Sequence, residues 1–354
     1  MKLVGLLLSP FSLLYGIVVC FRNKLFDLKI LKSEKFSLPI ISIGNLTMGG
    51  TGKTPHIEYL IRLLGGENKL ATLSRGYGRN TKGFLLVDDT LNAESAGDEP
   101  LQYRNKFKDV NVAVDEQRCR GIKTLIEKFP ETDIILLDDA YQHRYVKPGL
   151  SILLTDFYRP FSHDYIFPSG TLREFKSGKK RADIIIVTKS PRILSPITCK
   201  SMEEDMKLLP NQQVYYSYID YGDLVPLNDY SKSITTKKFS YTLMFAGVAN
   251  PYPMEEQLKT LSDTVEVLKF QDHYQYKTKD IQKIRDHFES IFPKNKVIIT
   301  TEKDAMRIKG TKLEEIFVNL PIFYIPIEIK LHKKDKENFD NQILNYVRKN
   351  KRNN

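Results

Sequence analysis

The segment Ile40–Thr54, with the sequence IISIGNLTMGGTGKT, constrains the fold of this chain more than any other. It places an apolar run, typical of a buried strand, directly before a glycine-rich loop that ends in Gly52, Lys53 and Thr54. Glycines let consecutive backbone N–H groups turn toward one anion, and a lysine adds positive charge at the same place. A helix that begins near Lys53, with Pro55 in its first turn, would add the positive end of its dipole. The segment therefore predicts a strand, a loop and a helix around a bound phosphate.

The loop departs at one position from the usual P-loop pattern, G-x-x-x-x-G-K-[ST], which would place a glycine where this chain has Thr47. An ordinary turn before a helix is the competing interpretation. Gly49 and Gly50 still precede Gly52, which favours the phosphate-binding loop. We therefore expect a nucleoside triphosphate to bind here, with Mg²⁺ at the hydroxyl of Thr54. The residues predicted to bind the nucleotide are Thr47, Met48, Gly49, Gly50, Thr51, Gly52, Lys53 and Thr54.

The N-terminal segment Leu3–Phe21 contains no charged residue and is followed by Arg22 and Lys24. Its nineteen residues reach the lower end of the length that spans a bilayer as a helix. Pro10 predicts a kink or break near the middle, so a full span and an interfacial membrane-associated helix both stay open. A cleaved secretory signal is less consistent, because no small-x-small site follows the apolar core.

The charge balance predicts an anionic partner. The 354 residues include 54 Lys and Arg against 43 Asp and Glu, for a net charge of +11. Such a balance suits nucleic acid, a phosphorylated substrate or an anionic membrane surface. The apolar N-terminus favours the membrane surface over nucleic acid. Three widely separated cysteines give neither a disulfide framework nor a zinc-binding spacing, and they indicate a reduced, cytoplasmic setting.

Short apolar runs alternate with helical stretches between residues 36 and 212. Most of these runs are continuously apolar, as expected for parallel strands that are covered on both faces. The alternation predicts a P-loop NTPase-like, doubly wound, mostly parallel α/β sheet with its ligand at the carboxyl ends of the strands. The expected strands are Pro39–Ile43, Leu70–Leu73, Phe84–Val87, Asn111–Val114, Ile134–Leu137, Ser151–Thr155 and Ile184–Thr188.

The pattern changes near Pro210, where an aromatic alternating stretch and then a polar stretch follow. We expect this region, 213–238, to connect the P-loop domain to a smaller α/β domain over 239–354, with the membrane-associated segment over 1–35. In the second domain the expected strands are Tyr241–Phe245, Val265–Phe270, Val297–Thr300 and Ile322–Ile325, and a helix with a frayed end is expected after Leu331.

Two acidic pairs could carry chemistry. Asp138 and Asp139 end an apolar strand, where a P-loop enzyme holds Mg²⁺ directly or through water. Asp98 and Glu99 lie in a turn, where a carboxylate could accept a proton from an attacking hydroxyl. His273, after a predicted strand, could pair with Asp98 as a base. For each group the alternative is an ordinary solvated turn or loop residue.

Two basic loops could bind phosphate or a headgroup. Ser74–Arg79 combines arginines with glycines, and Phe167–Arg181 is the densest basic loop inside the folded region. Solvated basic loops are the alternative interpretation.

Several short motifs follow one another in a fixed order along the chain. They are GNLTMGGTGKTP at 44–55, SRGYG at 74–78, GDEP at 97–100, DDAYQH at 138–143, PSGTLREF at 168–175, FAGVANP at 245–251, DHYQY at 272–276 and TEKDA at 301–305. With the apolar N-terminus, this ordered set resembles the tetraacyldisaccharide 4′-kinases, the lipid A 4′-kinases of Gram-negative bacteria. The resemblance implies a P-loop kinase at the cytoplasmic face of the inner membrane. Its substrates would be ATP with Mg²⁺ and the lipid A precursor tetraacyldisaccharide 1-phosphate, and its product lipid IVA.

The resemblance also implies roles for individual residues. Lys53 would hold the β- and γ-phosphates, and Asp98 with His273 would activate the 4′-hydroxyl. Metal contacts would come from Thr54, Glu99, Asp138 and Asp139. Substrate or phosphate contacts would come from Arg75, Tyr77, Gln142, Arg173 and Glu174.

Two other classes of function remain open from sequence. A membrane-attached P-loop ATPase switch would hydrolyse ATP without a lipid acceptor. A non-catalytic adaptor that binds anionic lipid would not need Lys53.

Overall fold

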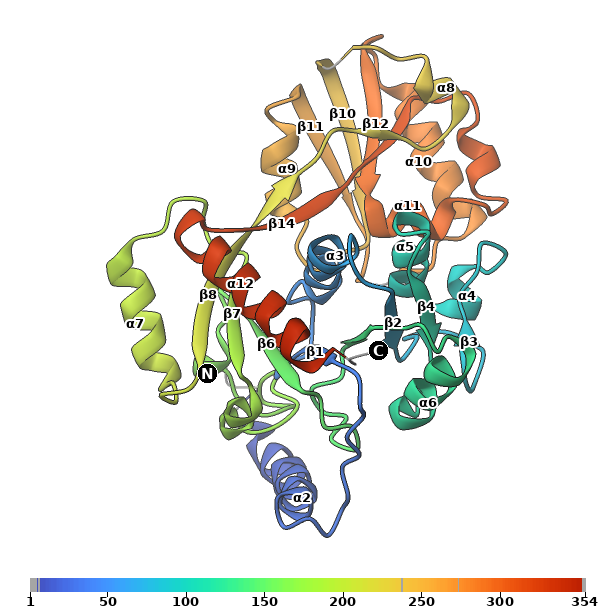
Figure 1. The fold of residues 1–354 in the computed structure, drawn as a ribbon. Helices are drawn as coiled ribbons and strands as arrows, with labels where there is room; N and C mark the ends of the chain where they lie inside the picture. Colours follow the sequence, from blue (N-terminus) through green and yellow to red (C-terminus); the bar gives the residue numbers. More distant parts are fainter. Residues whose placement is uncertain (1–4, 6, 237, 273, 352–354) are drawn as a thin grey trace. The chain divides into compact units, whose positions relative to one another are not determined.

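The chain divides into two compact units, which we describe separately. The computed structural model describes residue 5 and residues 7–236, 238–272 and 274–351 (Figure 1). Unit 1 comprises the N-terminal part up to Asp89, Tyr103–Ile219 and the C-terminal part from Ile329. Unit 2 comprises Thr90–Gln102 and Asp220–Glu328. The division therefore differs from the expected domains at the segment 90–102 and at the C-terminus.

The C-terminal helix α12 (Lys333–Asn350) belongs to unit 1 because its side chains are buried there. The ring of Phe339 packs edge-on against Tyr215, and the hydroxyl of Tyr346 donates to the carbonyl of Ile40 at 3.1 Å. Tyr59 donates a 2.6 Å hydrogen bond to Asp340. The helix itself was predicted, whereas its return to the first unit was not.

A nine-stranded sheet forms the centre of unit 1, in the order β14-β8-β7-β6-β1-β5-β2-β4-β3. Neighbours from β8 to β4 pair in parallel, and β3 pairs antiparallel to β4. The mostly parallel sheet predicted from the apolar runs is therefore confirmed. Its strands are β1 (Ile40–Asn45), β2 (Leu70–Ser74), β3 (Leu85–Leu86), β4 (Asn111–Val114), β5 (Ile134–Asp138), β6 (Leu150–Asp156), β7 (Ile184–Thr188), β8 (Gln213–Tyr221) and β14 (Ile327–Leu331).

Helices cover both faces of this sheet (Figure 1). On one face, Leu60 and Phe339 of α3 (Lys53–Leu64) and α12 lie with Ile43 of β1 around a small apolar cavity. On the other face, α6 (Arg118–Lys128) packs Ile122 in one apolar cluster, and α7 (Pro196–Met206) packs Met206 in another. Unit 1 is therefore doubly wound, as predicted.

Strand β8 corrects one expectation, because its residues were expected to form a connector. Tyr215 packs on Phe339 of α12, while the hydroxyl of Tyr216 donates to the carbonyl of Cys199 on α7. Alternate side chains of this strand are thus covered from opposite faces, so the aromatic alternation belongs to a sheet strand.

Unit 2 is a smaller α/β unit on a five-stranded sheet, in the order β11-β10-β12-β13-β9. Its four predicted strands are confirmed and pair in parallel, while β9 is antiparallel to β13. The elements are β9 (Val225–Pro226), β10 (Phe239–Ala246), β11 (Ser262–Lys269), β12 (Lys296–Thr301), β13 (Ile322–Ile325), α4 (Ala93–Ala96), α8 (Asp229–Lys232), α9 (Tyr252–Leu258), α10 (Thr278–Ser290) and α11 (Glu302–Ile308). Helix α5 (Asp98–Lys106) begins in this unit and ends in unit 1.

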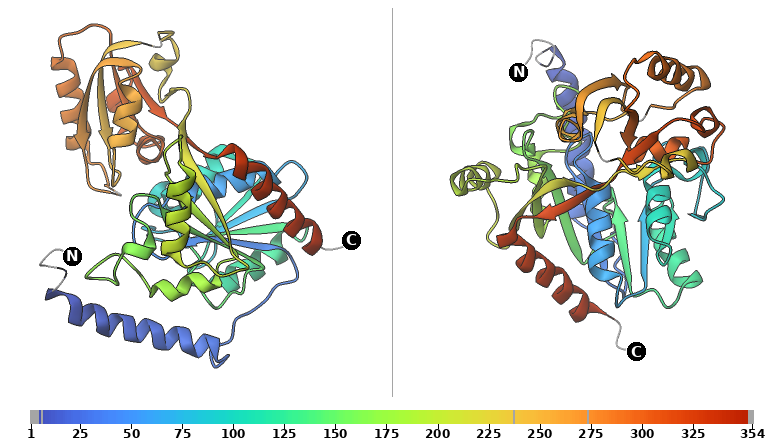
Figure 2. Two further views of the ribbon diagram at one scale, coloured as in Figure 1. Left: turned by 90° about the vertical axis from the view of Figure 1, so that its left-hand side faces the viewer. Right: turned by 90° about the horizontal axis from the view of Figure 1, so that it is seen from above.

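The N-terminal helix α2 (Ser9–Asp27) runs along one side of unit 1 (Figure 2). Pro10 lies in its first turn and starts the helix, so the kink expected near the middle is absent from α2. Leu3 and Val4, within the predicted apolar segment, lie outside the described residues. In the part of the chain that the structure describes, no helix combines the length and apolar character needed to cross a membrane.

Candidate nucleotide and phosphate site

The glycine-rich loop has the backbone form predicted from its sequence. Strand β1 is fully buried, and α3 begins at Lys53. Gly49 and Gly52 adopt φ values of 107° and 84°, which favour glycine. No side chain caps the start of α3. The first-turn N–H groups and the helix dipole are therefore available to an anion.

Thr47, the residue that departs from the P-loop pattern, has a structural reason to be there. It is buried and forms an antiparallel β-bridge with Leu172. On either side, the N–H of Met48 donates to Thr171 and that of Arg173 to Leu46, both at 2.7 Å. The bridge fixes the entrance of the loop, so a glycine is not required at position 47.

Two buried polar atoms of the loop fit a phosphate or its bound metal. Within the described residues, Asn45 Oδ1 and Thr51 Oγ1 are buried without a hydrogen-bond partner. Such orphaned groups cost free energy unless a ligand or water satisfies them. Together with the uncapped helix start, they support the predicted nucleotide site.

The acidic strand end lies directly beside the loop. Strands β1 and β5 pair in parallel with Ile43 opposite Asp138, so Asp139 follows at the same sheet edge. Lys53 Nζ lies 3.5 Å from Asp139 Oδ1, and Arg173 Nη1 lies 3.1 Å from it. Burial opposes ionisation of Asp139, but the charges of Lys53 and Arg173 outweigh burial and lower its pKa. Asp139 is therefore ionised and pairs with Lys53 and Arg173. Both cations can bind nucleotide phosphates in place of this carboxylate.

Asp139 also has strained backbone, with a φ of 47° that is uncommon for a residue other than glycine. Asp138 accepts a 2.9 Å hydrogen bond from the hydroxyl of Tyr103. Strain at the end of a strand recurs at functional sites, where it aims a side chain.

The predicted metal residues are divided between the two units. Among the described residues, no three Asp, Glu, His or Cys side chains form a ready metal cage. Glu99 belongs to unit 2, where it pairs with Lys303 at 3.2 Å. Thr54, Asp138 and Asp139 remain in unit 1 with the loop. Mg²⁺ commonly uses one or two protein ligands plus phosphates and water, so these residues fit MgATP.

Glu174 has a different place from the one expected of a substrate contact. It is buried and accepts hydrogen bonds from Asn23 of α2, Gln142 and Arg181, at 2.9, 3.1 and 2.7 Å. Gln142 also donates to the carbonyl of Asn45 at 2.8 Å. Glu174 and Gln142 thus attach α2 to the loop that follows β1.

Arg75 and Tyr77, two more of the five predicted substrate residues, lie on the surface. Arg75 is exposed, and Tyr77 is 69% exposed. The positive charge of Arg75 nonetheless contributes to lowering the pKa of Arg118 and the pKa of His143. Burial and these arginines lower the pKa of His143 to about 4, so its imidazole is neutral at neutral pH.

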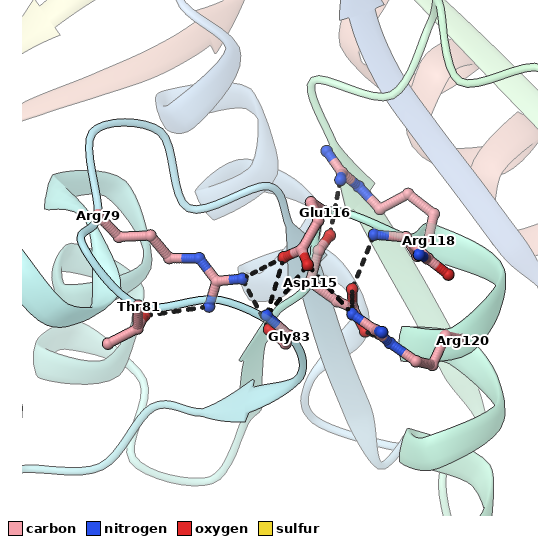
Figure 3. Close-up of polar contacts among 8 residues, drawn as sticks. Arg79, Thr81, Gly83, Asp115, Glu116, Arg118 and Arg120 are labelled. Atoms are coloured by element: carbon pink, nitrogen blue, oxygen red, sulfur yellow. Dashed lines mark hydrogen bonds and ion pairs between the residues drawn. The ribbon is translucent and has the colours of Figure 1, made fainter.

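Arg118 is a functional candidate that the sequence analysis missed. It is the first residue of α6, follows the Asp115–Glu116 corner, and is only 3% exposed (Figure 3). Nη1 donates to the carbonyl of Asp115 at 2.7 Å, while Nε and Nη2 have no hydrogen-bond partner among the described residues. Burial lowers its pKa to about 10, against the charges of Asp139 and Asp138. A buried guanidinium with two free donors beside the acidic strand end suits a phosphate oxygen.

The signal that could have identified Arg118 is weak. An arginine at the start of a helix opposes the helix dipole, so it needs a reason. The reason becomes visible only when the fold buries the side chain.

Replacing Arg118 with methionine is expected to separate stability from activity. The variant should unfold at a higher temperature, because removing a buried cation with unsatisfied donors gains about 1–3 kcal/mol. Phosphoryl transfer should fall about 10²- to 10³-fold, the usual effect of losing one donor to a transition-state charge. Thermal unfolding and steady-state kinetics measure the two effects.

The neighbouring Arg120 provides the matched control. It forms a bidentate pair with buried Asp115, at 2.9 and 2.8 Å. Arg120→Met should therefore lower the melting temperature. A destabilised Arg118→Met variant with normal activity would contradict the assigned role.

His56, on the first turns of α3, holds the end of the loop in place. Its Nδ1 lies 2.6 Å from the carbonyl of Gly52, and its Nε2 lies 3.0 Å from the hydroxyl of Ser217 on β8. Because a carbonyl only accepts, Nδ1 carries the proton and Ser217 donates to Nε2. Burial lowers the pKa of His56 to about 4, so the neutral form is the native one.

This burial predicts a pH dependence of stability. The pKa in the folded state, about 4, lies below the ordinary value of 6.5, so the unfolded chain binds the extra proton between these values. The contribution is full above pH 6.5 and falls by about 3 kcal/mol as the pH approaches 4. Urea unfolding across this range should show a shallower pH slope for His56→Gln than for the unaltered protein. Equal slopes would show that His56 is not buried in neutral form.

In unit 2, Asp98 is hydrogen-bonded by Arg307, and Arg307 is in turn positioned by residues of two other sequence motifs. Arg307 Nε and Nη2 donate to Asp98 Oδ2 at 3.0 and 2.5 Å. Arg307 Nη1 donates to buried Asp304 at 2.8 Å, and Asp304 accepts from the N–H of Gly247 at 2.9 Å. The TEKDA and FAGVANP motifs therefore orient Asp98 through Arg307. His273, its expected partner, lies outside the described residues.

Comparisons with known proteins agree with this arrangement. Residues 4–348 match the model of the family described as LpxK, tetraacyldisaccharide-1-P 4′-kinase. The chain is 44% identical to a tetraacyldisaccharide 4′-kinase of Bacteroides thetaiotaomicron, covering 98% of this chain and 94% of that protein. It is also 44% identical to that of Flavobacterium johnsoniae, covering 99% of both. A crystal structure of Aquifex aeolicus LpxK in complex with ATP superimposes with a TM-score of 0.72 at 26% identity, over 98% of this chain and 100% of that one.

Proposed function

This chain belongs to the tetraacyldisaccharide-1-P 4′-kinase family, and we propose on that basis that it phosphorylates the 4′-hydroxyl of tetraacyldisaccharide 1-phosphate with ATP. The product is lipid IVA, an intermediate of lipid A biosynthesis. The observation that carries the proposal is the glycine-rich loop with Lys53 beside Asp139, in a chain that matches the family from residue 4 to 348.

The residues around the loop bind and position the nucleotide. The start of α3, Lys53 and Thr51 receive the β- and γ-phosphates, and Lys53 exchanges Asp139 for phosphate oxygens. Mg²⁺ arrives with ATP as part of the substrate and neutralises phosphate charge, with Thr54 and the Asp138–Asp139 pair as its protein contacts. Arg118 and Arg173 stabilise the charge that develops on the transferred phosphoryl group.

Asp98 is the group that we assign to proton transfer from the acceptor hydroxyl, with His273 as its partner. Support comes from Arg307, which makes two hydrogen bonds to one oxygen of Asp98 and so positions the carboxylate. A general base needs such a positioned carboxylate or imidazole.

The membrane part of the proposal rests on α2. One side of this helix attaches to unit 1, where Ser12 donates to Ser169 and Tyr15 to the carbonyl of Arg173. Its outward side carries apolar side chains that are 54–66% exposed: Phe11, Leu13, Leu14, Ile17, Val18 and Phe21. Such a surface suits the interface of a bilayer, where an acceptor with four acyl chains resides. We therefore place the enzyme at the cytoplasmic face of the inner membrane, lying on the bilayer through α2.

The membrane assignment predicts that serines at Phe11, Leu14 and Val18 abolish most sedimentation with phosphatidylethanolamine–phosphatidylglycerol vesicles. Ile193, shortly before α7, and Ile197, in its first turn, are even more exposed and provide the matched control. Their serine variants should sediment normally. Unchanged sedimentation of the α2 variant would exclude the helix as the attachment site.

ADP production tests the kinase against an ATPase switch. A kinase should release ADP at a rate that depends on the lipid disaccharide, with one phosphorylated lipid for each ADP. An ATPase switch would release ADP equally with or without the lipid, and that result would reject the proposal.

A further inference from the structure

Two serines interrupt apolar strands at adjacent positions of the unit 1 sheet. Ser42 on β1 and Ser151 on β6 are register partners, so their side chains point to the same face. They are 2% and 7% exposed. Two hydroxyls side by side on one face of an otherwise apolar sheet can donate hydrogen bonds to a polar ligand.

Both serines line a cavity of about 1000 Å³ in unit 1. Its walls come from the end of α2 and the segment that follows it, from the segment after β5, and from the starts of β6 and β7. The volume is at the upper end of that of small-molecule sites, and far larger than a packing defect.

The cavity is separate from the nucleotide loop. The loop follows the carboxyl end of β1, whereas Ser42 lies in the middle of that strand and Ser151 near the amino end of β6. Glu174 lies between the two regions, since it binds Gln142 near the loop and Arg181 on the cavity wall.

Positive charge dominates the lining. Lys29, Lys32, Lys35 and Lys147 line the cavity, and none forms an ion pair among the described residues. The lining arginines are already paired, Arg144 with Asp27 and Arg181 with Glu174, both at 2.7 Å.

Asp183 is the remaining carboxylate of the lining. It accepts the N–H of Ser151 at 2.8 Å. Four unpaired lysines against this one carboxylate leave the cavity a strong excess of positive charge, which suits a multiply charged anion such as a phosphate group.

We propose that this cavity binds a lipid-borne phosphate group, with the hydroxyls of Ser42 and Ser151 as donors and the four lysines as counter-charges. A lipid is favoured because Phe26 and Asp27, at the end of α2, form part of the wall. The same helix carries the exposed apolar side, so the inference rests on the proposed membrane attachment. The phosphate has two sources: a bilayer phospholipid, or the acceptor lipid through its own phosphate.

The test replaces Ser42 and Ser151 with valine, which keeps the charge of the protein and suits buried strands. Binding of the full chain to phosphatidylcholine vesicles with and without phosphatidylglycerol is measured, together with the KM for the acceptor in neutral detergent. If the affinity for vesicles that contain phosphatidylglycerol falls about tenfold and the KM for the acceptor is unchanged, the site is assigned to bilayer lipid. A tenfold rise in KM at constant kcat assigns it to the acceptor.

Two further variants make the test decisive. Lys32→Gln with Lys147→Gln should show the same loss, whereas Lys279→Gln with Lys283→Gln, exposed on α10, should not. Unchanged vesicle binding and unchanged KM in the folded serine variant would overturn the inference. Failure of the proposed function would look different, since the unaltered protein would then transfer no phosphate to lipid.

Discussion

Lys53→Ala is expected to reduce lipid phosphorylation about 10²- to 10³-fold, with the effect concentrated in kcat. Lys53 is the cation on the nucleotide loop, and in this structure it faces Asp139 at 3.5 Å. Without it, the charge that develops on the transferred phosphoryl group loses one preorganised partner, and such a loss has this magnitude. Steady-state kinetics with saturating lipid, and nucleotide binding by calorimetry, measure the two contributions separately.

Stability provides the internal check on this result. Removing Lys53 also removes a partner of Asp139, so a modest fall in melting temperature is expected. Lys128→Ala, on the exposed side of α6, should leave both activity and stability unchanged. Phosphorylation at the normal rate by Lys53→Ala would exclude the loop as the catalytic nucleotide site and would favour a non-catalytic adaptor.

Asp98→Asn is expected to reduce kcat about 10²- to 10⁴-fold, the range for loss of a general base. Asparagine keeps the shape of the side chain and one oxygen for Arg307, but it cannot accept the proton of the acceptor hydroxyl. Binding of ATP should be close to normal, because the residues assigned to the nucleotide are unaltered. The measurement is a single-turnover assay with preformed enzyme–ATP complex.

Asp89→Asn is the matched control for Asp98. Asp89 is also a carboxylate with basic partners, Arg104 at 3.0 Å and Lys108 at 2.7 Å, but it is an exposed residue. This variant should keep full activity. If both variants turned over at the normal rate, the proton of the 4′-hydroxyl would have another acceptor.

The strand, loop and helix of the candidate nucleotide site were predictable because their signals are local. Strand β1, Gly52, Lys53 and the carboxylates at the end of β5 lie within short stretches whose spacing fixes their relation. The parallel sheet was predictable for a similar reason, since continuous apolar runs require covering on both faces.

The parts that sequence reasoning missed depend on long-range packing. Arg118 becomes a functional candidate only because the fold buries it within reach of the charge of Asp139, and no local pattern encodes that burial. From sequence, Glu174 was expected to contact the substrate. In the structure it accepts three hydrogen bonds, one of them from α2, and it attaches that helix to unit 1. The strand character of β8 depends on Phe339, which lies more than a hundred residues further along the chain.

The most direct test of the account is to identify the product. Purified protein, ATP and Mg²⁺ are incubated with tetraacyldisaccharide 1-phosphate in detergent micelles, and the lipid is examined by ³¹P NMR. The account predicts a second phosphomonoester signal, assigned to the 4′ position, that is absent with Lys53→Ala. A folded, ATP-binding protein that leaves the lipid with its single phosphate, or that releases only inorganic phosphate, would contradict it.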